Sequence, residues 1–145
     1  MTEDWRKRLD ATLDAIAQER IQTAADAKDA GKRRAAFMRR WRAALGATVE
    51  PALTDAGEPW LQRGLEWSLT VSGSPRSATL SVTIDRLGTC TLQFTGDPDR
   101  RRVVVSRTFG RPDIALERVG DHDVGEITRE RVQGYIDDFM RRLIS

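Results

Sequence analysis

The feature that most constrains this chain is a two-residue alternation of apolar and polar side chains between residues 65 and 109. The alternation falls into four stretches, separated by turn sequences at Ser72–Pro75, Asp85–Gly88 and Gly96–Asp99. Side chains two residues apart lie on one face of a strand, and short connections join strands that run antiparallel. The sequence therefore predicts a four-stranded antiparallel β-meander.

The two faces of this predicted sheet differ in chemistry. The face that we expect inside carries Trp67, Leu80, Leu92 and Val105. The other face is rich in hydroxyl groups, at Ser68, Thr70, Thr79, Ser81, Thr83, Thr89, Thr91 and Thr95, and it also carries the amide of Gln93. Such a face is ordinary for a solvated sheet, and it is also able to bind a partner, so both interpretations stay open. The alternation continues at Ile114–Val119, where a fifth strand fits.

A helix is predicted to follow the strands. Gly120–Gly125 has the composition of a loop, and Thr128 is a suitable N-cap for a helix from Arg129 to Leu143. The apolar residues of this segment fall on one helical face, at Val132, Tyr135, Ile136, Phe139, Met140 and Leu143. We expect this face to cover the apolar side of the sheet.

The segment Thr2–Gly46 contains no proline and is predicted to be helical. At about 100° per residue, one stripe connects Trp5, Leu9, Leu13, Ile16, Arg20, Ala24, Ala27, Gly31, Arg34, Met38, Trp41 and Leu45. The stripe is apolar at both ends, but Gln22–Ala36 has no large hydrophobic residue. One helix of about 44 residues would span roughly 65 Å; a hairpin with its turn at Asp29–Lys32 is the alternative. The unbroken phase of the stripe favours one helix.

These segments predict an α+β protein with three parts. Residues 1–47 form a helical arm, and residues 60–145 form the meander with its closing helix. Between them, residues 48–59 contain Pro51, Gly57 and Pro59 and are typical of a linker, in which one helical turn fits at Ala52–Ala56. We expect one domain overall.

Composition narrows the class of protein further. The formal net charge is only +2, so the whole chain exerts no strong electrostatic pull on nucleic acid or on an anionic membrane. No apolar run is long enough to span a bilayer, and a charged N-terminus without an apolar run after it argues against a secretory signal. A single cysteine fits a reducing compartment. We expect a soluble, cytoplasmic protein.

The arm is the expected site of partner binding. Ala24, Ala27 and Gly31 would let a second helix, such as another copy of the arm, approach closely. The residues expected to contribute to this surface are Ala24, Ala27, Gly31, Arg34, Met38 and Trp41.

An alternative site uses basic residues to bind nucleic acid. Its residues are Lys32, Arg33, Arg34, Arg39, Arg40, Arg42, Arg100, Arg101 and Arg102. On a helical wheel, however, the cations between Lys32 and Arg42 surround the helix instead of forming a stripe. Arginine stems that flank a buried seam give the same pattern.

Catalytic and metal chemistry are not expected. His122 is the single histidine, and its neighbours Asp121 and Asp123 come without the further ligands or the nucleophile that a site would need. A loop histidine is the better interpretation, although Asp121–Asp123 with Arg111 could serve a small enzyme. Cys90 alternates inward and is expected to be buried. We therefore expect no catalytic residues, no metal and no cofactor.

The predicted function is a non-enzymatic interaction module that forms homo-oligomers through the arm and binds a protein partner of unknown identity. A nucleic-acid-binding accessory protein is the alternative.

Overall fold

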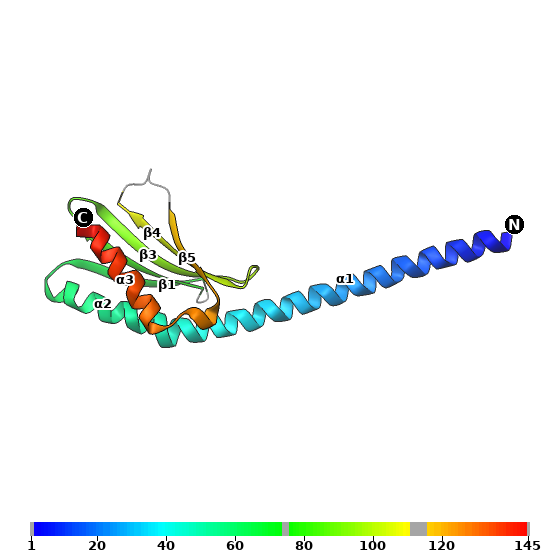
Figure 1. The fold of residues 1–145 in the computed structure, drawn as a ribbon, viewed down its shortest axis with the longest axis horizontal. Helices are drawn as coiled ribbons and strands as arrows, with labels where there is room; N and C mark the ends of the chain where they lie inside the picture. Colours follow the sequence, from blue (N-terminus) through cyan, green and yellow to red (C-terminus); the bar gives the residue numbers. More distant parts are fainter. Residues whose placement is uncertain (1, 74–75, 111–115, 145) are drawn as a thin grey trace. The chain divides into compact units, whose positions relative to one another are not determined.

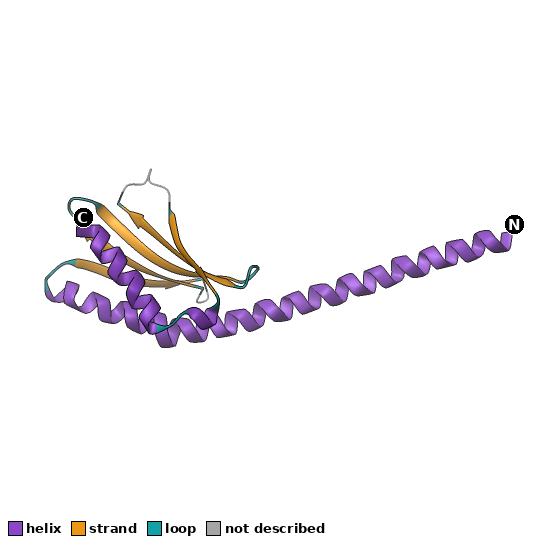
Figure 2. Cartoon of the chain, viewed as in Figure 1, coloured by secondary structure: helices purple, strands orange, loops and turns teal. Residues whose placement is uncertain are grey.

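A computed structural model describes residues 2–73, 76–110 and 116–144 of the chain. It divides into two compact units, Met1–Ala35 and Ala36–Ser145. The predicted α+β fold is confirmed: a long helical region is followed by an antiparallel sheet and a final helix (Figures 1 and 2).

The first helix, α1, is continuous from Thr2 to Ala44, so the single helix is correct and the hairpin is wrong. Helical structure does not stop at Gly46. A wider π turn spans Leu45–Val49, in which the Glu50 N–H donates to the Leu45 carbonyl, and α2 follows at Glu50–Gln62. The predicted linker at residues 48–59 is therefore helix.

Prolines led to this error. Pro51 lies in the first turn of α2, directly after the π turn. In that turn the hydrogen bond from Glu50 to Leu45 spans five residues instead of four, so the regular α-helical pattern is interrupted just before the proline. Pro59 lies in the last turn. Burial of Ala52, Leu53 and Gly57 provides the packing energy that favours the helix over a linker.

The sheet has five strands in the order β1-β2-β3-β4-β5, each antiparallel to its neighbour. Their bounds are β1 Glu66–Ser72, β2 Ser77–Ile84, β3 Gly88–Asp97, β4 Arg102–Phe109 and β5 Glu117–His122. The four predicted strands are confirmed. The fifth exists but ends later than Val119, and the first residues predicted for it, Ile114 and Ala115, lie outside the described residues. A register shift between Val105 and Ser106 interrupts the pairing of β4 with β5.

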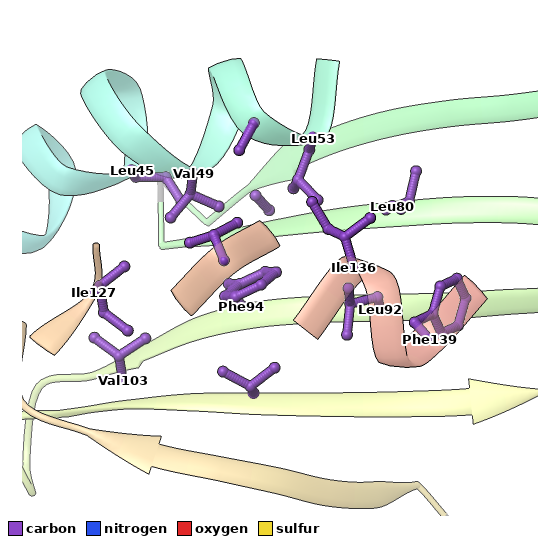
Figure 3. Close-up of a cluster of buried hydrophobic side chains, with 14 of the residues drawn as sticks. Leu45, Val49, Leu53, Leu80, Leu92, Phe94, Val103, Ile127, Ile136 and Phe139 are labelled. Carbon is purple, nitrogen blue, oxygen red and sulfur yellow. The ribbon is translucent and has the colours of Figure 1, made fainter. Parts of the chain in front are cut away.

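The core lies between the apolar face of the sheet and the helices of the second unit (Figure 3). Leu80, Leu92 and Val105 are buried and Trp67 is half-buried, which confirms the predicted inner face. The last helix, α3, spans Arg129–Ile144 and buries Val132, Ile136, Phe139 and Leu143, as its pattern predicts.

The end of α1 belongs to this core. Phe37 and Trp41 of α1 are buried, as is Leu45 at the start of the π turn, and the Trp41 indole N–H donates to the Arg76 carbonyl at 2.6 Å. Gly96 leaves room for this indole, because a Cβ there would lie 2.3 Å from a ring carbon. The predicted arm at residues 1–47 therefore spans both units.

Candidate interaction surfaces

The first unit is an exposed helix with an apolar stripe. Every residue from Glu3 to Ala35 is exposed. Trp5, Leu9, Leu13 and Ile16 occupy successive turns on one helical face and are 60%, 41%, 53% and 50% exposed. Four large hydrophobic side chains aligned on a solvated helix are typical of an interaction surface. We call these four residues the apolar stripe.

The predicted partner-binding residues are divided between the two units. Ala24, Ala27, Gly31 and Arg34 are exposed in the first unit. In the second unit Met38 is half-buried, and Trp41 is 0% exposed. Trp41 therefore supports the core of its own chain and offers no surface to a partner.

The expected surface also omitted the strongest candidates. The apolar stripe was visible in the sequence as one end of a longer periodic stripe, but the other end, at Met38–Leu45, has the same apolar character. Periodicity does not indicate which end the sheet covers. The structure places the second end in the core and leaves the first exposed.

The basic segment Lys32–Arg42 presents its six cations at exposed positions. The aromatic residues between them, Phe37 and Trp41, are buried and cannot stack on bases. The predicted nucleic-acid site is therefore without its aromatic component, and its use by nucleic acid stays a prediction.

The second part of that site, Arg100–Arg102, lies beside carboxylates. Arg100 donates to Asp121 at 2.7 Å, and Arg102 donates to Asp121 and Asp123, each at 2.7 Å. Hydrogen bonds from Arg102 and Arg100 lower the pKa of the Asp121 carboxyl. This ion-pair network joins the turn before β4 to the end of β5 and compensates the charge of two of the three arginines.

His122 belongs to strand β5, so its assignment to a loop is wrong. The Arg131 guanidinium, which can only donate, contacts His122 Nδ1 at 3.1 Å. His122 Nε2 then carries the proton and donates to the Tyr135 hydroxyl oxygen. Burial, together with the charge of Arg131, lowers the pKa of His122. Gly120 makes this contact sterically feasible, because a Cβ there would lie 2.0 Å from the Tyr135 oxygen.

His122, Tyr135 and Arg131 form a cluster that joins β5 to α3 and stabilises the fold. Tyr135 also packs edge-on against Phe94, with 6.0 Å between ring centroids. Burial raises the pKa of the Tyr135 hydroxyl. No signal in the sequence pairs Tyr135 with His122, since the two lie on different elements.

Further candidate sites carry little chemistry. Within the described ranges, no group of three or more His, Cys, Asp or Glu side chains is arranged to hold a metal ion. Cys90 is buried as predicted, and burial raises the pKa of its thiol. A shallow hollow at the end of α2 is lined by Pro59, Trp60, Arg63 and Leu65.

The hydroxyl-rich face satisfies part of its own hydrogen bonding. Thr91 and Thr108 stand opposite each other on β3 and β4, with their hydroxyl oxygens 2.6 Å apart. Thr83 and Thr89 form a similar pair at 3.3 Å. Cross-strand pairs of this kind stabilise a sheet. Binding of a partner to this face stays a prediction.

The fold and the apolar stripe thus define an α+β domain that follows an exposed helical segment. No family model, curated protein or solved structure matches this chain. In the part of the chain that the structure describes, none of the helices combines the length and apolar character needed to cross a bilayer.

Proposed function

We propose that this chain is a protein–protein interaction module that self-associates through the first unit of α1. The observation that supports the proposal is the apolar stripe of Trp5, Leu9, Leu13 and Ile16, which stays exposed in the single chain. Association would remove these side chains from water, and this burial stabilises the complex by about 25 cal/mol for each Å² of apolar surface.

Helix stability supports the same proposal. A solvated helix gains little from its own backbone hydrogen bonds, and most helices in proteins depend on packing of an apolar face. The first unit packs no residue from Glu3 to Ala35 into a core of its own chain. A second polypeptide would provide the missing packing surface.

The second unit supplies the folded domain that such an arm would bring together. Cys90 is its buried, unpaired thiol, which is in keeping with a reducing compartment, and we propose a cytoplasmic location on that basis.

The test is the molar mass of the full chain in solution, measured by light scattering over a range of concentrations. We expect about twice the 16.3 kDa of one chain, and a mass near that of one chain for the double variant Leu9→Glu/Ile16→Glu. The matched control is Ala11→Glu/Gln18→Glu, which adds the same charge at the same spacing on the opposite helical face. It should keep the wild-type mass. A wild-type chain that stays monomeric at high micromolar concentration would overturn the proposal.

A further inference from the structure

Between Leu9 and Gly31, the helical face that carries the apolar stripe has a symmetric spacing. From the stripe into the small-residue segment, its positions are Leu9, Leu13, Ile16, Arg20, Ala24, Ala27 and Gly31. The steps are 4, 3, 4, 4, 3 and 4 residues, so they are the same in both directions from Arg20. All of these positions lie in the exposed first unit.

Symmetric spacing matters because an antiparallel pair of identical helices has a two-fold axis. If that axis passes through Arg20, Leu9 faces Gly31 of the second copy, Leu13 faces Ala27, and Ile16 faces Ala24. Each of these three large side chains then meets a small one. A Cβ at Gly31 would have no atom within 4 Å in its own chain, so this position is open for a partner side chain.

A parallel pair lacks this complementarity. It would place leucine against leucine at one end and glycine against glycine at the other. Two straight helices keep one separation along their contact, and close packing tolerates few voids. Leucine pairs would hold the helices too far apart for Ala27 and Gly31 to touch their equivalents. Side-chain size therefore favours the antiparallel orientation.

Charge favours the same orientation. Residues 3–19 carry five acids and three bases, whereas residues 21–35 carry two acids and four bases. Antiparallel pairing places the acidic half of one arm against the basic half of the other. On one flank of this pair, Asp10 and Asp14 of one copy lie opposite Lys28 and Lys32 of the other.

The other flank is less favourable. There Arg8 of one copy approaches Arg33 of the other. Asp4, one turn before Arg8, supplies a compensating charge. A parallel pair would instead bring together two acidic halves and two basic halves. Opposite charges between the halves therefore select orientation, whereas the apolar stripe supplies affinity.

Arg20 itself lies at the centre of the stripe. A polar residue at one core position fixes register at some cost in stability, and the long arginine stem can carry its charge out to water. The 11-residue separations from Leu9 to Arg20 and from Arg20 to Gly31 correspond to about 3.67 residues per turn, a period typical of slight right-handed supercoiling.

We propose that the partner of the apolar stripe is a second copy of the chain, bound antiparallel about a two-fold axis at Arg20. The inference rests on the proposed self-association and adds its orientation and register.

Disulfide trapping in the full chain tests the orientation. In a Cys90→Ala background, Leu9→Cys chains are mixed with equal amounts of Gly31→Cys chains in a glutathione redox buffer. Disulfides form only where Cα atoms come within about 7 Å. We expect the mixed 9–31 disulfide far above its random-pairing share, and little disulfide from either chain alone. Arg20→Cys should link to itself, whereas Gln18→Cys, on the opposite face, should not.

The outcomes separate this inference from the proposed function. Predominant 9–9 and 31–31 disulfides in a protein of dimeric mass would overturn the antiparallel orientation and leave self-association intact. A monomeric mass for the untrapped wild-type chain would overturn both. A mixed 9–31 disulfide no more abundant than the Gln18→Cys product would also overturn the orientation.

Discussion

At the scale of single residues, His122 illustrates how a side chain obtains its environment from distant parts of the chain. Burial disfavours the charged imidazolium, and Arg131 and Arg102 repel it, while Glu126 and Asp121 act in the opposite direction. The balance lowers the pKa of His122 below its ordinary value. Its nearest partners, Tyr135 and Arg131, both come from α3.

This shift predicts a pH dependence of stability. The unfolded chain takes up the proton at a higher pH than the folded chain does, because the folded pKa is lower. The contribution of His122 is therefore complete above about pH 6.5 and is lost as the pH falls through the folded pKa. Between about pH 7.5 and about pH 5.5, the wild-type urea midpoint should fall more than that of His122→Gln. Equal falls in both proteins would contradict the assignment.

The local sequence around His122 predicts a loop, because its pattern is ambiguous. Gly120 and Gly125 flank it, and glycine is common in turns. Here Gly120 instead provides room for Tyr135, a requirement that exists only once α3 has packed on the sheet. Cys90, by contrast, was correctly expected to be buried because it continues a clean alternation along β3.

At the scale of elements, α1 combines two kinds of helix in one continuous segment. Its last turns bury Phe37 and Trp41, whereas the residues from Glu3 to Ala35 are exposed. The buried part is stabilised by its own chain. The exposed part depends on backbone propensity and on any partner.

This difference predicts concentration-dependent protection of the arm. Amide hydrogens of residues 5–31 should exchange more slowly as protein concentration rises, because association adds packing that the monomer lacks. Amides of β3 should show no such change. In Leu9→Glu/Ile16→Glu, the arm should exchange rapidly at every concentration. Arm protection that is the same in dilute and concentrated wild-type protein would argue against association.

The elements differed in how well the sequence predicted them. The meander and α3 were predictable because their apolar periods are clean and their turns short. The helix α2 was not, since Pro51, Gly57 and Pro59 are local signals for a linker. Its helical state depends on burial of Leu53 beneath the sheet, which is a tertiary effect.

At the scale of the whole molecule, the described core begins at Phe37 and ends at Leu143. It draws on α1, α2, the sheet and α3, and it includes no residue of the first unit. We therefore expect the second unit to fold cooperatively without the first.

Two truncations test this division. A chain that begins at Ala36 should unfold cooperatively and should be monomeric. A chain that begins at Ala47 lacks Phe37, Trp41 and Leu45, whose burial contributes about 1.5–3 kcal/mol each. This loss is comparable with the whole stability of a typical domain, about 5–15 kcal/mol. The chain that begins at Ala47 should therefore lack a cooperative thermal transition in circular dichroism. Loss of cooperative unfolding in the chain that begins at Ala36 would show that the first unit contributes to the fold.

The sequence by itself determined the strands, the closing helix and the unbroken phase of α1, because these follow from periodic patterns within each segment. Only the tertiary structure decided which end of the α1 stripe is buried. Trp5, Leu9 and Ile16 have the same periodic placement as Trp41 and Leu45, and no local pattern shows which of them the sheet will cover. Burial depends on which surfaces meet in the folded chain. Trp41 packs in the core of the second unit, whereas the apolar stripe stays exposed.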